Sequence, residues 1–108
     1  KYLDPNAVKL HVPAKIDIDI AEKIRELSVK AYRALNCEDF ARVDLFLKPN
    51  GDILINEINT IPGFTNSSMF PMMWEERGIS FSDLISQLIE MALERQKSNQ
   101  RITNQYKV

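Results

Sequence analysis

Four polar side chains with the right chemistry for a metal or phosphate site occur in two neighbouring apolar segments. Arg42 and Asp44 lie in the first segment, and Glu57 and Asn59 lie in the second. Carboxylate and amide oxygens are hard ligands of the kind that Mg²⁺ prefers. An arginine beside them could bind a phosphate or stabilise a developing negative charge. These residue types indicate a magnesium and phosphate site, provided that the fold brings the four side chains together.

The two segments have the pattern of a β-hairpin. Residues 40–48 and 52–58 are rich in apolar residues, and the Asn50-Gly51 pair between them is a strong turn signal. The expected cross-strand pairs are Pro49 with Asp52, Phe46 with Ile55, Asp44 with Glu57, and Arg42 with Asn59. Because strand side chains alternate between faces, all but the turn pair should share one face. The opposite face should be core, and it carries Val43, Leu45, Leu47, Leu54 and Ile58.

Asp44 and Glu57, placed directly across the two strands, would repel each other unless a cation or water screens them. One interpretation is that a bound cation screens the two carboxylates. The simpler alternative is a hairpin with one solvated face, which shows the same alternation of polar and apolar residues. Register predicted from sequence can also shift by one residue. Spacing alone favours the simpler interpretation.

Helices are expected before and after the hairpin in the sequence. Apolar residues at helical spacing predict a helix over residues 20–35, with Asp19 as its N-cap and Glu22 completing a capping box. A short helix around residues 72–77 should follow the loop at 59–71. The fold class is therefore α+β, with an antiparallel β-sheet and flanking helices.

The last predicted helix spans residues 81–97, with Ser80 as its cap. Residues 98–108 are polar and predict a flexible tail, so residues 1–97 form the structured part. The sequence starts at Lys1 without an initiator methionine, and we expect residues 1–97 to be a fragment of a longer catalytic domain.

Composition argues against several classes of protein. The net charge is −1, with 14 basic and 15 acidic residues spread along the chain, which does not favour nucleic-acid binding. No apolar run approaches the roughly 20 residues that a membrane span needs. The single cysteine, Cys37, fits a reduced cytoplasmic compartment.

Three motifs together resemble the signature of D-alanine–D-alanine ligases, which belong to the ATP-grasp superfamily. The motifs are Ala41-Arg42-Val43-Asp44, then Asn56-Glu57-Ile58-Asn59-Thr60-Ile61-Pro62-Gly63-Phe64-Thr65, then Ser68-Met69-Phe70-Pro71. The likeness continues through residues 78–85, reaches back to Lys1-Tyr2, and covers nearly everything before about Arg95. It implies the C-terminal part of an ATP-grasp fold.

The resemblance also implies a reaction. ATP would phosphorylate the carboxylate of a first D-alanine, and the amine of a second D-alanine would attack the acyl phosphate. The product, D-alanyl-D-alanine, is a peptidoglycan precursor. The family further implies two Mg²⁺ ions, with Mn²⁺ as a substitute, and a cytoplasmic homodimer. The composition, as above, predicts no nucleic-acid or membrane partner.

The resemblance assigns roles to residues of this sequence. Asp44, Glu57 and Asn59 would hold the metal ions. Catalytic roles fall to Arg42, to the Gly63 backbone N–H as an oxyanion donor, and to Lys1 and Tyr2. The remaining assignments are Ser68 and Met69 for the second D-alanine, and Phe46 and Asn56 for the adenine pocket.

Two other functions remain open. Ligases of the same family that add D-serine or D-lactate often carry a basic residue at the position of Met69, so methionine there favours D-alanine, as does Tyr2. A non-catalytic nucleotide-binding module is the alternative from another class. The presence of all the expected metal ligands and of Arg42 argues against it.

Overall fold

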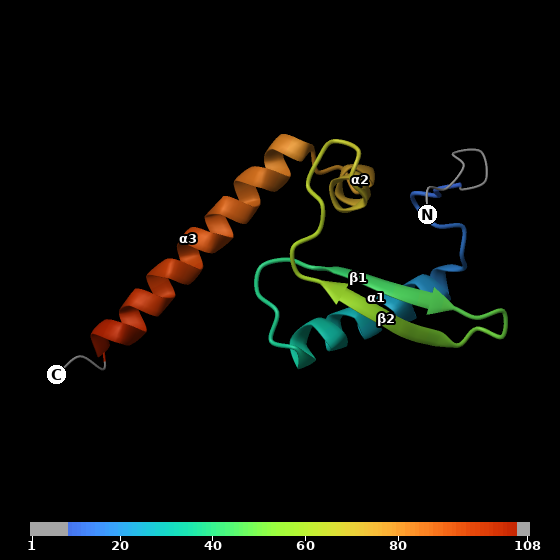
Figure 1. The fold of residues 1–108 in the computed structure, drawn as a ribbon, viewed down its shortest axis with the longest axis horizontal. Helices are drawn as coiled ribbons and strands as arrows, with labels where there is room; N and C mark the ends of the chain where they lie inside the picture. Colours follow the sequence, from blue (N-terminus) through green and yellow to red (C-terminus); the bar gives the residue numbers. More distant parts are fainter. Residues whose placement is uncertain (1–8, 106–108) are drawn as a thin grey trace, which may run out of the picture.

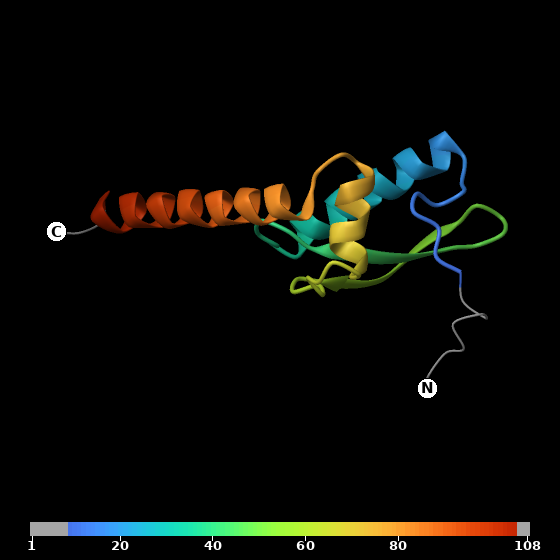
Figure 2. The ribbon, with the colours of Figure 1, turned by 90° about the horizontal axis from the view of Figure 1, so that it is seen from above.

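The computed structural model describes residues 9–105, so Lys1 and Tyr2 lie outside the described residues. The described chain has three helices and two antiparallel strands in the order α1, β1, β2, α2, α3. Helix α1 lies across one face of the β1–β2 hairpin, and α3 extends away from it (Figures 1 and 2). The predicted α+β class with an antiparallel sheet is confirmed.

Helix α1 spans Ile18–Ala34 and starts earlier than predicted. Asp17, and not Asp19, is the N-cap residue, and its carbonyl oxygen accepts a hydrogen bond from the Ala21 N–H at 2.9 Å. The expected capping box was therefore wrong. Asp19 lies inside the first turn, where its negative charge is near the unpaired amides of the helix N-terminus. The apolar stripe of α1 packs against both strands.

Strand β1 spans Arg42–Leu47 and strand β2 spans Ile53–Asn59. The turn between them differs from the expected two-residue turn. The Lys48 N–H donates to the Asp52 carbonyl at 2.8 Å, so Lys48 faces Asp52 in place of Pro49. Proline has no N–H to donate to a paired strand, which explains the difference. Gly51 takes up the required left-handed conformation, with φ at +93°.

The register changes once along the hairpin. Near the turn the pairs are Leu47 with Ile53, Phe46 with Leu54, and Leu45 with Ile55. A bulge then adds Asn56 to β2, and beyond it the pairs are Asp44 with Glu57, Val43 with Ile58, and Arg42 with Asn59. The predicted Phe46–Ile55 pair was wrong, and Leu54 lies opposite Phe46 and not on the core face. The predicted pairs at the candidate site are confirmed because the bulge offsets the shift that the turn introduces.

Helix α2 spans Met69–Glu76 and helix α3 spans Phe81–Gln105. The predicted cap of α3 is confirmed, because the Asp83 N–H donates to Ser80 Oγ at 3.1 Å. The predicted end at residue 97 was wrong, and the segment expected to be a flexible tail is helical as far as Gln105. Residues 98–105 contain neither glycine nor proline, so nothing in them ends the helix.

An aromatic cluster joins the loop after β2 to the two following helices. Phe64 in that loop lies 5.8 Å from Phe70 of α2 and 5.3 Å from Phe81 of α3, measured between ring centroids. Phe40, which precedes β1, lies 5.5 Å from Phe70. Phe70 is buried, with 4% of its surface exposed. The loop after β2 is therefore held in place by the ring of Phe64.

An ion pair connects α3 to the loop between α1 and β1. Arg95 Nη2 lies 2.8 Å from Asp39 Oδ2, and Arg95 Nε lies 3.2 Å from Glu38 Oε2. Asp39 has φ at +64°, a left-handed conformation that aspartate tolerates better than most residues. Among the described residues, no helix has the length and apolar character needed to cross a membrane.

Candidate metal and phosphate site

Arg42 and Asp44 form a two-pronged ion pair on the hairpin face opposite α1. Arg42 Nε donates to Asp44 Oδ1 at 2.8 Å, and Arg42 Nη2 donates to Asp44 Oδ2 at 2.9 Å. Alternation along β1 places the two side chains on the same face, two residues apart. Both side chains are largely covered, with 19% and 27% of their surfaces exposed. The guanidinium is therefore held in a fixed orientation beside the carboxylate.

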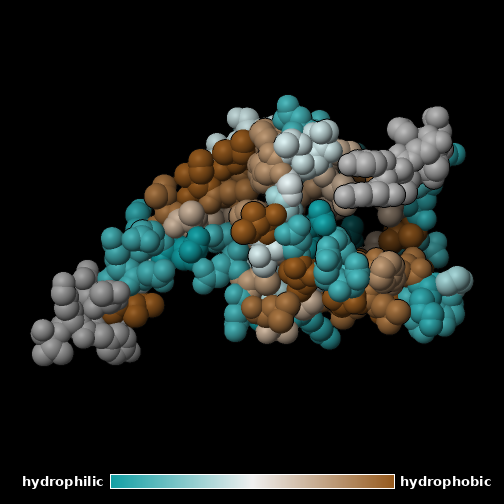
Figure 3. Space-filling model, viewed as in Figure 1, coloured by the Kyte–Doolittle hydropathy of each residue, from teal (hydrophilic) through white to brown (hydrophobic). Residues whose placement is uncertain are grey.

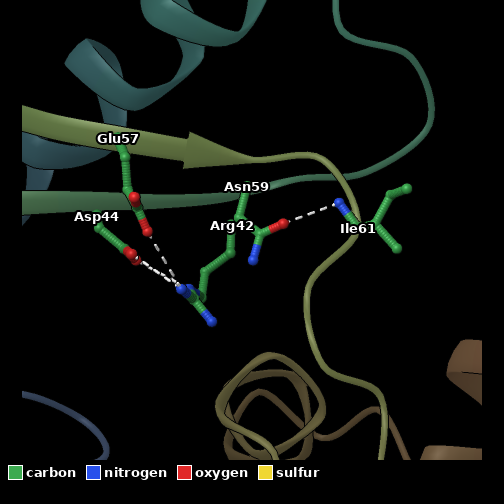
Figure 4. Close-up of polar contacts among 5 residues, drawn as sticks. All are labelled: Arg42, Asp44, Glu57, Asn59 and Ile61. Carbon is green, nitrogen blue, oxygen red and sulfur yellow. Dashed lines mark hydrogen bonds and ion pairs between the residues drawn. The ribbon is translucent and has the colours of Figure 1, made fainter.

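Glu57 completes the charged group from the neighbouring strand. Its Oε1 lies 3.8 Å from Arg42 Nη2, and its side chain is 59% exposed. Figure 4 shows Asp44 and Glu57 pointing toward the same guanidinium from β1 and β2. In this structure Arg42 thus relieves the repulsion that two facing carboxylates would otherwise have.

The ion pair shifts the pKa values of both partners. Hydrogen bonds from Arg42 lower the pKa of the Asp44 carboxyl below its ordinary value, although burial acts in the opposite direction. The hydrogen bond to Asp44 raises the pKa of Arg42. Asp44 is therefore ionised at neutral pH, the state in which a carboxylate binds a metal.

Asn59 faces Arg42 across the strands, but its side chain takes a different direction. Its Oδ1 accepts a hydrogen bond from the Ile61 N–H at 3.0 Å, which turns the amide toward the following loop (Figure 4). The structure therefore brings Arg42, Asp44 and Glu57 together and leaves Asn59 at the edge of this group. One lone pair of its oxygen remains for another partner.

The donor set fits a hard divalent cation. Within the described residues, no group of three or more histidine, cysteine, aspartate or glutamate side chains could hold a metal. The hairpin offers a metal ion two carboxylates, those of Asp44 and Glu57, and the Asn59 amide oxygen at the edge of the group. Mg²⁺ is commonly held by one or two carboxylates, while water and phosphate oxygens complete its shell.

A second group of polar atoms lies in the loop after β2. Ser68, the residue before α2, accepts a hydrogen bond at Oγ from the Thr65 N–H at 3.0 Å. Thr65 Oγ1 lies 2.7 Å from the same oxygen. A Cβ added at Gly63 would meet Ser68 Oγ at 3.1 Å, so Gly63 and Ser68 are neighbours. The fold therefore brings together the two loop residues that the sequence singled out separately.

Three further predicted site residues lie on the hairpin and at the start of α2. Phe46 is 58% exposed on the half of the hairpin near the turn, and Asn56 is the extra residue of the bulge. Met69 begins α2 beside Ser68 and is 41% exposed. Thr65 was missed by sequence reasoning. A hydroxyl three residues before Ser68 is compatible with a turn that joins them, and this signal was available.

Comparison with solved structures identifies the fold, which this chain shares with part of the ATP-grasp ligases. The chain superposes on a D-alanine–D-alanine ligase from Coxiella burnetii with a TM-score of 0.83 at 41% identity, covering 86% of this chain and 27% of that one. It also resembles the VanG D-Ala:D-Ser ligase from Enterococcus faecalis, with a TM-score of 0.74 at 46% identity, covering 77% and 24% of the two chains.

Sequence comparison identifies the family. Residues 1–90 match the family model described as the D-ala D-ala ligase C-terminus, and the chain belongs to this family. It is 50% identical over 99 residues to D-alanine–D-alanine ligase A of Salmonella typhimurium, which covers 92% of this chain and 27% of the relative. The chain thus spans about a quarter of the length of the curated relatives that it matches.

Proposed function

We propose that this chain is the metal- and phosphate-binding part of an ATP-dependent D-alanine–D-alanine ligase. The observation that carries the proposal is the charged group on the hairpin, where Arg42, Asp44 and Glu57 converge from two strands. This group is what a phosphoryl-transfer site needs, since such sites work by positioning and charge stabilisation. One related structure, a Bacillus anthracis ligase, is a complex with ATP and shares 32% identity with this chain at a TM-score of 0.73.

In the proposed reaction, ATP phosphorylates the first D-alanine and the amine of the second attacks the acyl phosphate. Asp44, Glu57 and Asn59 would hold two Mg²⁺ ions, or Mn²⁺, on the ATP phosphates. Bound ions neutralise charge on the transferred phosphoryl group. Arg42 would stabilise the negative charge of the acyl phosphate and of the tetrahedral intermediate.

The loop residues would act on the acceptor side of the reaction. The Gly63 N–H would donate to the developing oxyanion. Ser68, with Met69, would bind the carboxylate of the second D-alanine. Lys1, Tyr2, Phe46 and Asn56 keep the roles that the resemblance gave them. The product would serve peptidoglycan synthesis in the cytoplasm, and the complete enzyme would be a homodimer.

Replacement of one metal ligand tests the proposal. Asp44→Asn in the complete protein keeps the shape of the side chain but removes its charge. We expect ligation to fall by more than about 100-fold, because loss of even an outer-shell partner of a metal costs about 10–100-fold. Dipeptide formation is measured against Mg²⁺ concentration.

The matched control is Asp52→Asn, the same substitution at the turn of the same hairpin, where the carboxylate bonds Asn50. It should retain activity. Ligation by Asp44→Asn with normal dependence on Mg²⁺ would contradict the metal assignment. Absence of ligation by the unmodified complete protein would favour the non-catalytic module over an enzyme.

A D-alanine–D-serine ligase is the second candidate. The observation in its favour is the 46% identity to the VanG D-Ala:D-Ser ligase, a value as high as that to several D-alanine–D-alanine ligases. The identity of the product decides between the two. A mixture of D-alanine, D-serine and D-lactate should yield mainly D-alanyl-D-alanine, whereas mainly D-alanyl-D-serine would establish the second candidate.

A further inference from the structure

The hydrogen bonds of Ser68 show how its hydroxyl is oriented. A serine hydroxyl has one proton to donate and two lone pairs that accept. One lone pair of Ser68 Oγ accepts from the Thr65 N–H at 3.0 Å. The Thr65 hydroxyl lies 2.7 Å away, close enough for a strong hydrogen bond in either direction. The direction of that second bond decides whether the proton of Ser68 is free.

A negatively charged ligand determines the direction. A carboxylate accepts hydrogen bonds and donates none, so it takes the Ser68 proton. The remaining lone pair of Ser68 Oγ is then filled by the proton of Thr65. The resulting chain runs from Thr65 to Ser68 to the ligand, and each bond polarises the next. Without the Thr65 hydroxyl, that lone pair would lose its donor.

We infer that Thr65 is a positioning residue that orients the Ser68 hydroxyl as a donor to the carboxylate of the second amino acid. This inference rests on the proposed function and adds a residue to it. Thr65 acts through Ser68, with its N–H and its hydroxyl filling both acceptor positions of one oxygen.

The surroundings support this role. The Ser68 N–H donates to the Thr65 carbonyl at 3.0 Å, so backbone and side chain join the same two residues. Phe64, the residue before Thr65, is held against Phe70 and Phe81. Gly63 leaves space beside Ser68 Oγ, because a Cβ at Gly63 would lie 3.1 Å from that oxygen. Thr65 is thus held by the packed ring of its neighbour Phe64 and by its hydrogen bonds to Ser68.

The test uses two substitutions at Thr65 in the complete protein, one without the hydroxyl and one with it. Thr65→Val keeps the shape and the N–H but removes the hydroxyl, and Thr65→Ser keeps the hydroxyl. Loss of one hydrogen bond of about 1.4 kcal/mol corresponds to about tenfold in affinity. We expect Thr65→Val to raise the KM for the second D-alanine about tenfold with little change in kcat. Thr65→Ser should stay within about threefold of the unmodified protein.

A double-mutant cycle separates positioning from a general effect on the loop. Ser68→Ala removes the oxygen through which Thr65 acts, so Thr65→Val should add little to Ser68→Ala. Fully additive effects would overturn the inference, as would equal losses in Thr65→Val and Thr65→Ser. The KM for ATP serves as an internal control and should not change.

The outcomes distinguish the inference from the proposed function. If the unmodified protein ligates D-alanine but Thr65→Val has normal kinetics, the role of Thr65 alone is wrong. If the unmodified protein releases no phosphate from ATP in the presence of D-amino acids, the proposed function fails. The inference that Ser68 binds a carboxylate then fails with it.

Discussion

At the scale of single residues, the pairing of Arg42 with Asp44 is the central feature of the candidate site. The sequence analysis assigned phosphate binding to Arg42 and metal binding to Asp44, as separate roles. The structure shows that they bind each other through two hydrogen bonds of 2.8 and 2.9 Å. A ligand that recruits either residue must compete with this pair. The carboxylate and the guanidinium therefore remain charged and oriented before any ligand arrives.

Removal of the guanidinium should change how Asp44 titrates. Arg42 lowers the pKa of Asp44, so its contribution to stability is present above the ordinary carboxyl pKa and is lost as pH falls through the lowered value. In Arg42→Met the pKa of Asp44 should rise, and acid unfolding should begin at a higher pH. Carboxyl carbon NMR across a pH titration measures the shift.

The control for that titration is Arg25→Met. Arg25 pairs with Glu22 on the exposed side of α1, with its Nη1 3.1 Å from Glu22 Oε1. This variant loses an arginine from the chain but not from the hairpin. An unchanged Asp44 titration in Arg42→Met would show that the ion pair does not form in solution.

At the scale of elements, the caps illustrate what the sequence specifies. Ser80 was predicted to cap α3, and its Oγ accepts from the Asp83 N–H. Ser80→Ala should destabilise the protein by about 1 kcal/mol, because one helix N–H then loses its partner. Chemical denaturation of the complete protein measures the change. Ser82→Ala, an exposed position in the first turn of the same helix, is the matched control and should have a smaller effect.

Equal destabilisation by the two serine substitutions would contradict the capping role. The start of α1 shows the opposite outcome of the same reasoning. Asp17 and Asp19 are two residues apart, and either one satisfies the preference for an N-cap. Local sequence therefore does not distinguish between the two possible starts of the helix.

The pairing of residues across the hairpin could be predicted at the candidate site but not near the turn. Alternating polar and apolar residues placed Asp44 opposite Glu57, and the structure has this pair. The Phe46–Ile55 pair failed because the turn shifts the register by one residue, and the bulge that restores it lies beyond Phe46. No local signal marks Asn56 as the bulged residue. Contacts between Gly63, Thr65 and Ser68 depend on how the loop folds back, which spacing along the chain does not determine.

At the scale of the whole molecule, the chain is extended and sparsely buried. Its dimensions are 60 × 30 × 30 Å, and its radius of gyration of 17.4 Å exceeds the roughly 13 Å typical of 100 residues. Apolar side chains are exposed along α3 and over the hairpin (Figure 3). An open apolar groove of about 310 Å³ is lined by Phe40, Phe64, Ile85, Leu88, Ile89 and Ala92. Patches of this kind mark surfaces that pack against other parts of a protein.

The 108 residues alone should therefore form no dipeptide and should bind an apolar dye such as anilinonaphthalene sulfonate. Ile89, which lines the groove and is 55% exposed, supplies part of the dye-binding surface. Ile89→Gln should reduce dye fluorescence, and Glu90→Gln on the same helix should not. Dipeptide synthesis by this chain in isolation would show that the site needs no further residues.

The charges of the hairpin group also have a consequence for the rate at which ions arrive. Arg42, Asp44 and Glu57 together carry one positive and two negative charges, which leaves a single net negative charge. The long-range field felt by an approaching cation is therefore weak, and the most exposed of the three, Glu57, provides most of it. Capture of cations from solution should depend only mildly on ionic strength, since screening has little attraction to remove. Selectivity at this hairpin must come from contacts made at close range.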